Sequence, residues 1–138
     1  MASAGIQSKL MNTNKDTQLR DEILGPYSDK KPRGGIVIFS GVPLGILQRL
    51  IDLGFVEMGQ WNACPGVTDL FLPFLKKNPL FTAHGYAVSG QRKDSRITVE
   101  GVERSASLTK EEIIDFANAF RRADDFEVTA DHARCWYD

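Results

Sequence analysis

Hydrophobic and polar residues alternate along two neighbouring segments, Phe81–Ser89 and Arg96–Glu103, which a polar stretch separates. Alternation with a period of two is typical of half-buried strands, and the second segment is rich in β-branched residues that suit a pleated sheet. The polar stretch between them predicts a solvent-exposed loop. We therefore expect an antiparallel hairpin over residues 81–103, around which the rest of the chain is organised.

The hydrophobic pattern predicts a register for this hairpin in which three pairs lie opposite one another: Val88 with Ile97, Tyr86 with Val99, and His84 with Gly101. Side chains alternate between the faces of a sheet, so this register predicts that the face with His84, Tyr86 and Ile97 contacts the core. The other face carries small and mixed side chains. A shift of one residue would exchange the two faces.

Four other segments have strand-like patterns: Ile36–Phe39, Phe55–Met58, Phe126–Ala130 and Ala133–Tyr137. The first is entirely apolar, which predicts a strand buried on both faces. The last two flank Asp131 and His132, residues that tolerate turn conformations, and are expected to form a second hairpin.

Helical spacing of apolar residues predicts four helices: a short one over Asp16–Leu24, one from Pro43 to Leu53, one from Thr68 or Asp69 to about Lys77, and one that begins after Thr109. Gly54 is expected as a left-handed C-terminal cap of the second helix. Thr109 and Glu112 match a capping box. Ile113, Phe116 and Phe120 form the apolar stripe of the last helix.

This order of elements indicates an α+β fold. We expect a two-layer sandwich, in which a mixed, mostly antiparallel sheet of about five strands is covered by about three helices. Residues 34–138 are expected to form a single α+β domain. Residues 1–33 are expected to form a polar N-terminal arm that could contain a short helix.

The composition places the 138-residue chain among ordinary soluble globular proteins, with 42% hydrophobic and 25% charged residues. A formal net charge of −1 provides no overall attraction to nucleic acid or to an anionic membrane. No apolar run has the length of a membrane span, and no signal-peptide pattern is present. Two cysteines form no disulfide framework, which favours a cytoplasmic location.

The sequence contains no motif that identifies a catalytic reaction. The Ser40–Gly45 segment, at a predicted strand-to-helix turn, could bind an anion through free backbone N–H groups, but it lacks the P-loop and dinucleotide glycine patterns. A small ligand site or enzyme active site would lie between this turn, the 61–69 loop and the hairpin. Its candidate residues are Ser40, Gly41, Trp61, Asp69, His84 and Tyr86.

The cysteines and histidines allow two weaker hypotheses. Cys64, His84, His132 and Cys135 are enough for one zinc ion, but no paired ligand spacing supports that site. Cys64 and His84 could form a nucleophile–base pair, although no surrounding motif indicates an activated thiolate. Scattered carboxylates could act in acid–base chemistry only if the fold made them converge. We therefore expect no metal and no cofactor, and we assign no catalytic residue.

Protein contacts are the function that the sequence favours. Arg134, Trp136 and Tyr137 belong to residue types that interface cores favour, and their strand is expected at a sheet edge, where another chain can pair. If Phe126 and Tyr137 point inward, Trp136 and Arg134 share the opposite face. Nucleic-acid binding through the basic loops, Lys30–Arg33 and Arg92–Arg96, is an alternative, but aromatic residues do not interleave with these charges. We therefore expect a non-enzymatic binding or regulatory module that self-associates, as a homodimer or with another protein partner.

Overall fold

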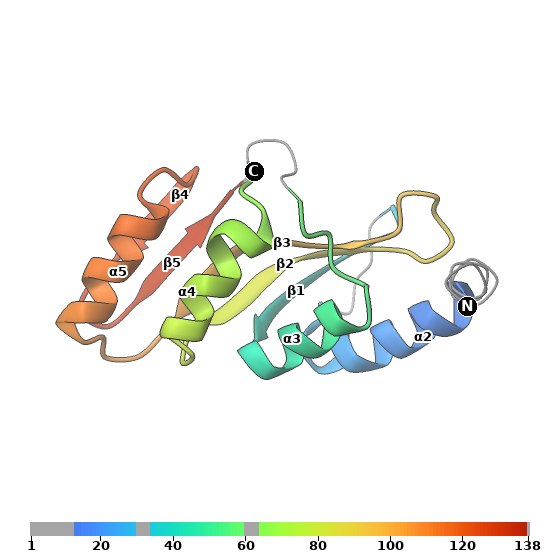
Figure 1. The fold of residues 1–138 in the computed structure, drawn as a ribbon, viewed down its shortest axis with the longest axis horizontal. Coiled ribbons are helices and arrows are strands. Elements are labelled where there is room, and N and C mark those ends of the chain that lie inside the picture. The colour runs from blue at the N-terminus through green and yellow to red at the C-terminus, as the bar shows by residue number, and fades with distance from the viewer. Residues whose placement is uncertain (1–12, 30–33, 60–63, 138) are drawn as a thin grey trace.

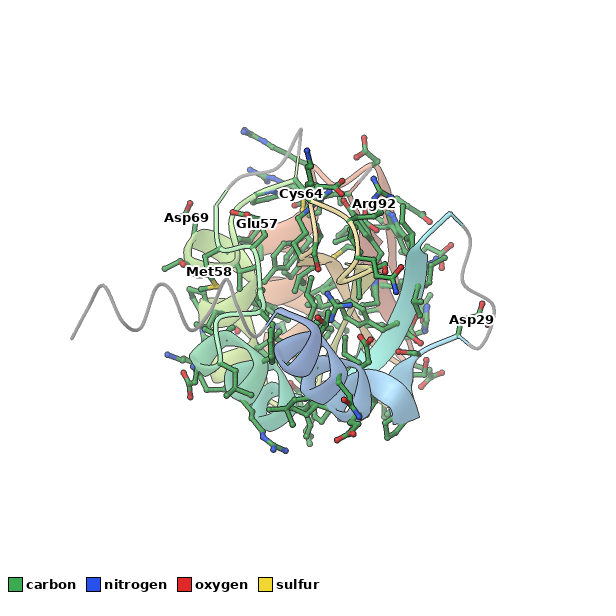
Figure 2. The ribbon with its side chains drawn as sticks, turned by 90° about the vertical axis from the view of Figure 1, so that its right-hand side faces the viewer. Asp29, Glu57, Met58, Cys64, Asp69 and Arg92 are labelled. Atoms are coloured by element: carbon green, nitrogen blue, oxygen red, sulfur yellow. The ribbon has the colours of Figure 1, made fainter. Side chains whose placement is uncertain are left out.

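The computed structural model describes residues 13–29, 34–59 and 64–137, which form an open five-stranded sheet with helices packed on one face. The helices are α2 (Thr13–Leu24), α3 (Leu44–Asp52), α4 (Leu72–Lys77) and α5 (Lys110–Phe120). The strands are β1 (Ile36–Val42), β2 (Thr82–Val88), β3 (Ile97–Arg104), β4 (Asp125–Val128) and β5 (Ala133–Trp136). In Figure 1 the helices lie in front of the sheet, and Figure 2 shows the layers from the side, with α3 and α4 to the left of β1. The predicted two-layer α+β class is confirmed.

The strands lie in the order β1-β2-β3-β5-β4, and each neighbouring pair is antiparallel. The predicted strand Phe55–Met58 is reduced to one parallel bridge between Val56 and Ile97. The C-terminal strand β5 does not lie at an edge, so that prediction is wrong. The outer strand is β4, because the far end of β3 pairs with β5 and leaves the second hairpin to extend the sheet outward.

The register of the central hairpin differs from the prediction at two of its three pairs. Ala87 lies opposite Ile97, and Gly85 lies opposite Val99. A bulge between His84 and Gly85 then restores the predicted partner of His84, Gly101. The extra residue in β3 shifts all pairs on one side of the bulge by one position.

This shift reverses the faces of β2 that the pattern predicted. Ala83 and Ala87 belong to the hydrophobic core together with Ile97, Val99 and Val102. Tyr86 and His84 point to the face away from the helices, so their predicted place against the helices is wrong, although His84 is buried on that other face. Small side chains on β2 let the helices approach the sheet closely, and the larger β-branched residues of β3 fill the space beside them.

A cluster of phenylalanines joins the helices to the sheet. The ring of Phe74 in α4 contacts Phe81 and Phe120, with centroid distances of 4.9 and 4.8 Å. Phe116 of α5 stacks on Phe126 of β4 at 5.3 Å. Phe116 and Phe120 are completely buried, as the predicted apolar stripe of this helix requires, whereas its third member, Ile113, is only half-buried.

The local signals at helix ends are largely confirmed. Thr109 and Glu112 form both hydrogen bonds of the capping box of α5. Gly54 has φ = 81° and follows α3, and the N–H of Phe55 donates to the carbonyl of Leu50 at 3.0 Å. Neither Thr68 nor Asp69 caps a helix: a π-helical turn, η2 (Val67–Phe71), precedes α4 and has Gly66 as its N-cap.

The strand and the helix nearest the N-terminus among the described residues, β1 and α2, also refine the prediction. β1 runs on to Val42 and is buried only at Phe39 and Val42, so it is not a strand buried on both faces. The helix expected over Asp16–Leu24 is present as α2, and it packs on the sheet through Ile23 and Leu24.

Candidate functional site

The face of the sheet opposite the helices, here called the open face, is covered by none of the described helices. Alternation along each strand places on it Ile38 and Ser40 of β1, His84 and Tyr86 of β2, Arg96, Thr98 and Glu103 at β3, Arg134 and Trp136 of β5, and Asp125 and Glu127 of β4. Ile38 is 50% exposed, a large value for an isoleucine in a strand. The open face therefore combines apolar, aromatic and charged groups in the absence of a described covering layer.

Near β5, three side chains stack across the open face. The rings of His84 and Trp136 lie 4.6 Å apart with an interplanar angle of 26°, and the guanidinium of Arg134 lies 5.3 Å from the Trp136 ring centre. Arg134 also contacts the carboxylates of Glu103 and Asp125, at 3.3 and 3.4 Å. These contacts hold the indole in one orientation, while part of its surface stays accessible to a partner.

His84 bridges β2 to β5 by crossing over Gly101 of β3. Its Nε2 lies 2.8 Å from the carbonyl oxygen of Cys135, and because a carbonyl only accepts, Nε2 must carry the proton. A Cβ on Gly101 would lie 2.5 Å from the His84 ring, so glycine is required for this crossing. The other ring nitrogen, Nδ1, is buried and has no hydrogen-bond partner among the described residues.

The environment of His84 keeps its imidazole neutral. Burial lowers the pKa of His84 from 6.5 to about 4, and the nearby Arg134 cation acts in the same direction. The hydrogen bond to Cys135 acts in the opposite direction and is outweighed. At neutral pH the ring is therefore a neutral structural bridge and a poor proton acceptor.

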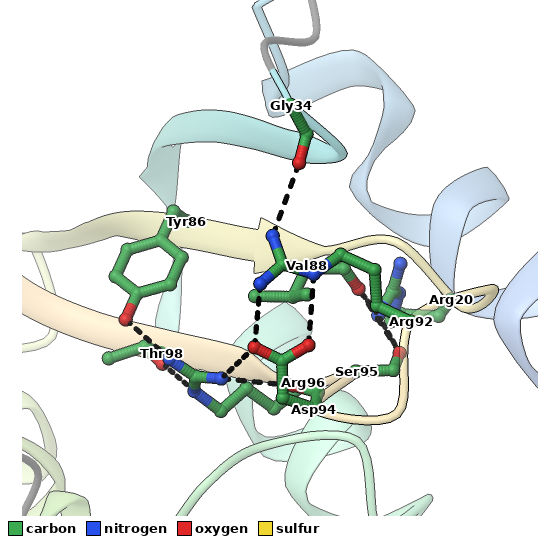
Figure 3. Close-up of polar contacts among 9 residues, drawn as sticks. All are labelled: Arg20, Gly34, Tyr86, Val88, Arg92, Asp94, Ser95, Arg96 and Thr98. Carbon is green, nitrogen blue, oxygen red and sulfur yellow. Dashed lines mark hydrogen bonds and ion pairs between the residues drawn. The ribbon is translucent and has the colours of Figure 1, made fainter.

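A second polar cluster lies at the hairpin end of the open face, where Arg96 covers Tyr86 (Figure 3). The Arg96 guanidinium lies 5.5 Å from the Tyr86 ring centre, and Nη2 donates to the Tyr86 hydroxyl at 2.9 Å. Its Nε donates to Thr98 Oγ1 at 3.1 Å. Arg92 binds both carboxylate oxygens of Asp94, at 2.9 and 2.8 Å, and thereby orders the loop. The cluster is preorganised by these bonds.

The structure brings several of the predicted site residues together and separates others. The β1–β2 register moves from Phe39–Gly85 to Val42–Ala83, so Ser40 and Gly41 form a bulge opposite His84. Tyr86 lies on β2, two residues after His84. The predicted residues Ser40, His84 and Tyr86 therefore share the open face with Trp136 and Arg134.

Asp69 and Tyr137 lie elsewhere, and Trp61 lies outside the described residues. Asp69 lines a cavity of about 340 Å³ between α4 and α5, beside Lys77 and Asp115. Tyr137 is buried, and its ring meets that of Phe71 edge-on at 5.9 Å. Tyr137 therefore belongs to the core and does not contribute to the open face. This position agrees with the expectation that Phe126 and Tyr137 point inward.

The cysteines belong to the core side of the sheet. Cys64 Sγ donates to the carbonyl of Val99 at 3.3 Å, and both thiols are buried and free. Burial raises the pKa of each thiol to about 12, which leaves them protonated and weakly nucleophilic. His84 points to the opposite face, so the geometry does not support a Cys64–His84 catalytic pair. No cluster of three metal-ligating side chains occurs in residues 13–29, 34–59 and 64–137.

Sequence reasoning missed two features of this site. The pattern places Arg96 at the start of the second hairpin strand and in a basic segment, but it does not predict the contact of Arg96 with Tyr86. Ile38 was expected to be buried with the rest of β1. Predicting that Arg96 lies over Tyr86 requires the correct register between β2 and β3. The bulge between His84 and Gly85 sets that register and cannot be read from the sequence. The basic segment Lys30–Arg33 lies outside the described residues.

No family model matches this chain, and no characterised protein or solved structure matches it either. Among the described residues, no helix is both long and apolar enough to cross a membrane. Functional conclusions must therefore come from the chemistry of the open face and of the cavities.

Proposed function

We propose that this protein is a non-enzymatic binding module that self-associates through the open face of its sheet. The observation that carries the proposal is the exposed Ile38 on the same face as two aromatic side chains, Tyr86 and Trp136, each held in place by an arginine. Aromatic residues and arginine are enriched in interface cores. Preorganised side chains also lose little conformational freedom when a partner binds.

Charge supports a second copy of the chain as the partner. The hairpin loop at one end of the open face contributes Arg92, Lys93 and Asp94, and together with Arg96 they give a net charge of +2 from three cations and one anion. The other end carries Glu103, Asp125, Glu127 and Arg134, a net charge of −2 from three anions and one cation. In Figure 1 the hairpin loop lies at the right and β4 and β5 lie at the left. In a twofold dimer, the basic end of one copy would meet the acidic end of the other.

The edge of the sheet is a less suitable contact for self-association. The outer strand β4 carries Asp125 and Glu127, which are both exposed. Two β4 strands paired around a twofold axis would bring these carboxylates close to those of the partner, and like charges across strands are destabilising. We therefore place the contact on the open face and not on the edge that the sequence suggested.

Analytical ultracentrifugation over a dilution series tests this proposal with two matched variants. Ile38→Glu alters the open face, whereas Ile114→Glu alters an isoleucine of α5 that is 47% exposed on the helical layer. We expect Ile38→Glu to weaken association at least tenfold, because burying the exposed half of Ile38 contributes about 1 kcal/mol in each of the two copies. Ile114→Glu should leave association unchanged, and raising the salt concentration should weaken it. A wild-type protein that stays monomeric at the highest concentration would disprove self-association.

Single-stranded nucleic acid is the second candidate, because bases stack on aromatic rings and Arg96 and Arg134 could contact phosphates. The acidic end of the open face disfavours it. Retention on heparin at low salt, reduced by Arg96→Gln, would favour this candidate over a dimer. The cytoplasmic location is part of the main proposal, since free buried thiols suit a reducing compartment.

A further inference from the structure

A cavity of about 530 Å³ lies between α2 and the helix-covered side of the sheet, away from the open face. Its walls combine the apolar side chains Leu24, Val37 and Ala87 with Arg20, Asp21 and Ser28. Cavities that bind small molecules have this size, and they join mostly apolar walls to a few polar groups. The one positively charged group among the described lining residues is Arg20.

Arg20 is 4% exposed, and one of its nitrogens anchors α2 to the hairpin. Nη1 donates to the carbonyl of Val88 at 2.8 Å and to Ser95 Oγ at 3.2 Å (Figure 3). These bonds fix the position of the guanidinium and do not use its other edge, which carries Nε and Nη2. The charge is therefore held at the cavity by contacts that a ligand would not need to break.

The other edge of the Arg20 guanidinium meets only one oxygen of one carboxylate. Nε and Nη2 both donate to Asp21 Oδ1, at 3.0 and 2.9 Å. A carboxylate that presents two oxygens would give each nitrogen its own acceptor, which is the stronger, bidentate arrangement. The Asp21 side chain is 63% exposed, and adjacent residues of a helix do not face each other, so Asp21 can turn into water at small cost.

We propose that this cavity binds a small monocarboxylate with an apolar body. The ligand carboxylate replaces Asp21 on Nε and Nη2 of Arg20, and its apolar body contacts Leu24, Val37 and Ala87. A single negative charge matches Arg20, the one cation among the lining residues that the structure describes. A doubly charged phosphate fits less well, because the Asp21 carboxylate lines this cavity and the Glu22 carboxylate lines a second cavity that shares Asp21 and Ser89 with it.

Isothermal titration calorimetry of the full chain with benzoate tests the site, and benzamide is the neutral control ligand. Asp21→Asn removes the negative charge of the internal competitor and leaves only a neutral amide oxygen as its acceptor. Glu22→Gln makes the same change in net charge on the same helix without altering a partner of Arg20. We expect Asp21→Asn to bind benzoate about tenfold more tightly than the wild type, the value of about one charge-assisted hydrogen bond. Glu22→Gln should change the affinity less than twofold, and benzamide should not bind.

Three results would overturn the proposal. The first is no heat of benzoate binding to Asp21→Asn at tens of millimolar ligand. The second is an equal gain in affinity from Glu22→Gln, which would show a general charge effect. The third is binding of benzamide as tight as that of benzoate. Because both substitutions lie at exposed positions of α2, each variant is expected to fold, so any of these results would be decisive.

Discussion

Acidification should destabilise this protein through His84. In the folded state burial lowers the pKa of His84 to about 4, whereas an unfolded histidine titrates near 6.5. Between these values the unfolded chain binds more protons than the folded protein, so stability falls as the pH falls. The full difference of about 2.5 between the two pKa values corresponds to a loss of ~3 kcal/mol in the free energy of unfolding, which is complete only below pH 4. About 2 kcal/mol of this loss should already be present at pH 5.

Urea unfolding followed by tryptophan fluorescence, at intervals between pH 8 and pH 5, measures this loss. Other groups also titrate in this range, so the informative quantity is the difference in unfolding free energy between wild type and His84→Gln. The glutamine variant lacks the titrating ring and should be less stable at pH 8, because it loses the Trp136 stack. The difference should shrink by about 2 kcal/mol as the pH falls to 5.

His132→Gln is the matched control, since it makes the same substitution at the other histidine, whose side chain is 33% exposed and lies 3.7 Å from Glu127. Only a pH-dependent difference larger than the one measured for His132→Gln is assigned to His84. If the difference between wild type and His84→Gln is the same at pH 8 and pH 5, then His84 is not held neutral by the fold, and the account of its environment fails.

Two further predictions concern packing and thiol chemistry. Gly101→Ala should destabilise the fold by about 1–3 kcal/mol, because its Cβ would overlap the Cys135 carbonyl oxygen and press on His84. Gly45→Ala in α3, where a Cβ meets nothing within 4 Å, should be neutral or stabilise the fold by up to ~1 kcal/mol. Equal midpoints of thermal denaturation for the two variants would contradict this prediction. Cys64 and Cys135 should react with a thiol reagent at pH 8 only as fast as the protein opens, because burial raises their pKa to about 12, so rapid labelling under native conditions would contradict their burial.

Signals that depend on a few neighbouring residues were readable from the sequence. The capping box of α5, the left-handed glycine after α3 and the stripe of phenylalanines each follow from local hydrogen bonding or helical spacing, and the structure confirms them. The two hairpins and the α+β class follow from alternation and from the order of elements. The predicted separation of Trp136 and Arg134 from Phe126 and Tyr137 holds for the same reason, because alternation is a property of a single strand.

Tertiary structure alone decided which side of the central hairpin meets the helices. On β2 the sequence offers Ala83, Gly85 and Ala87 on one face and His84 and Tyr86 on the other, and a strand with one small face and one amphipathic face does not specify its orientation.

The bulge between His84 and Gly85 and the position of β5 inside the sheet were likewise hidden from the sequence. A bulge changes pairing between strands without changing the pattern within either strand, and the order of strands depends on which edges remain free after packing. The open face, and with it the candidate interface, therefore arises from contacts between segments far apart in the chain, where the energies of packing exceed the preferences of any local pattern.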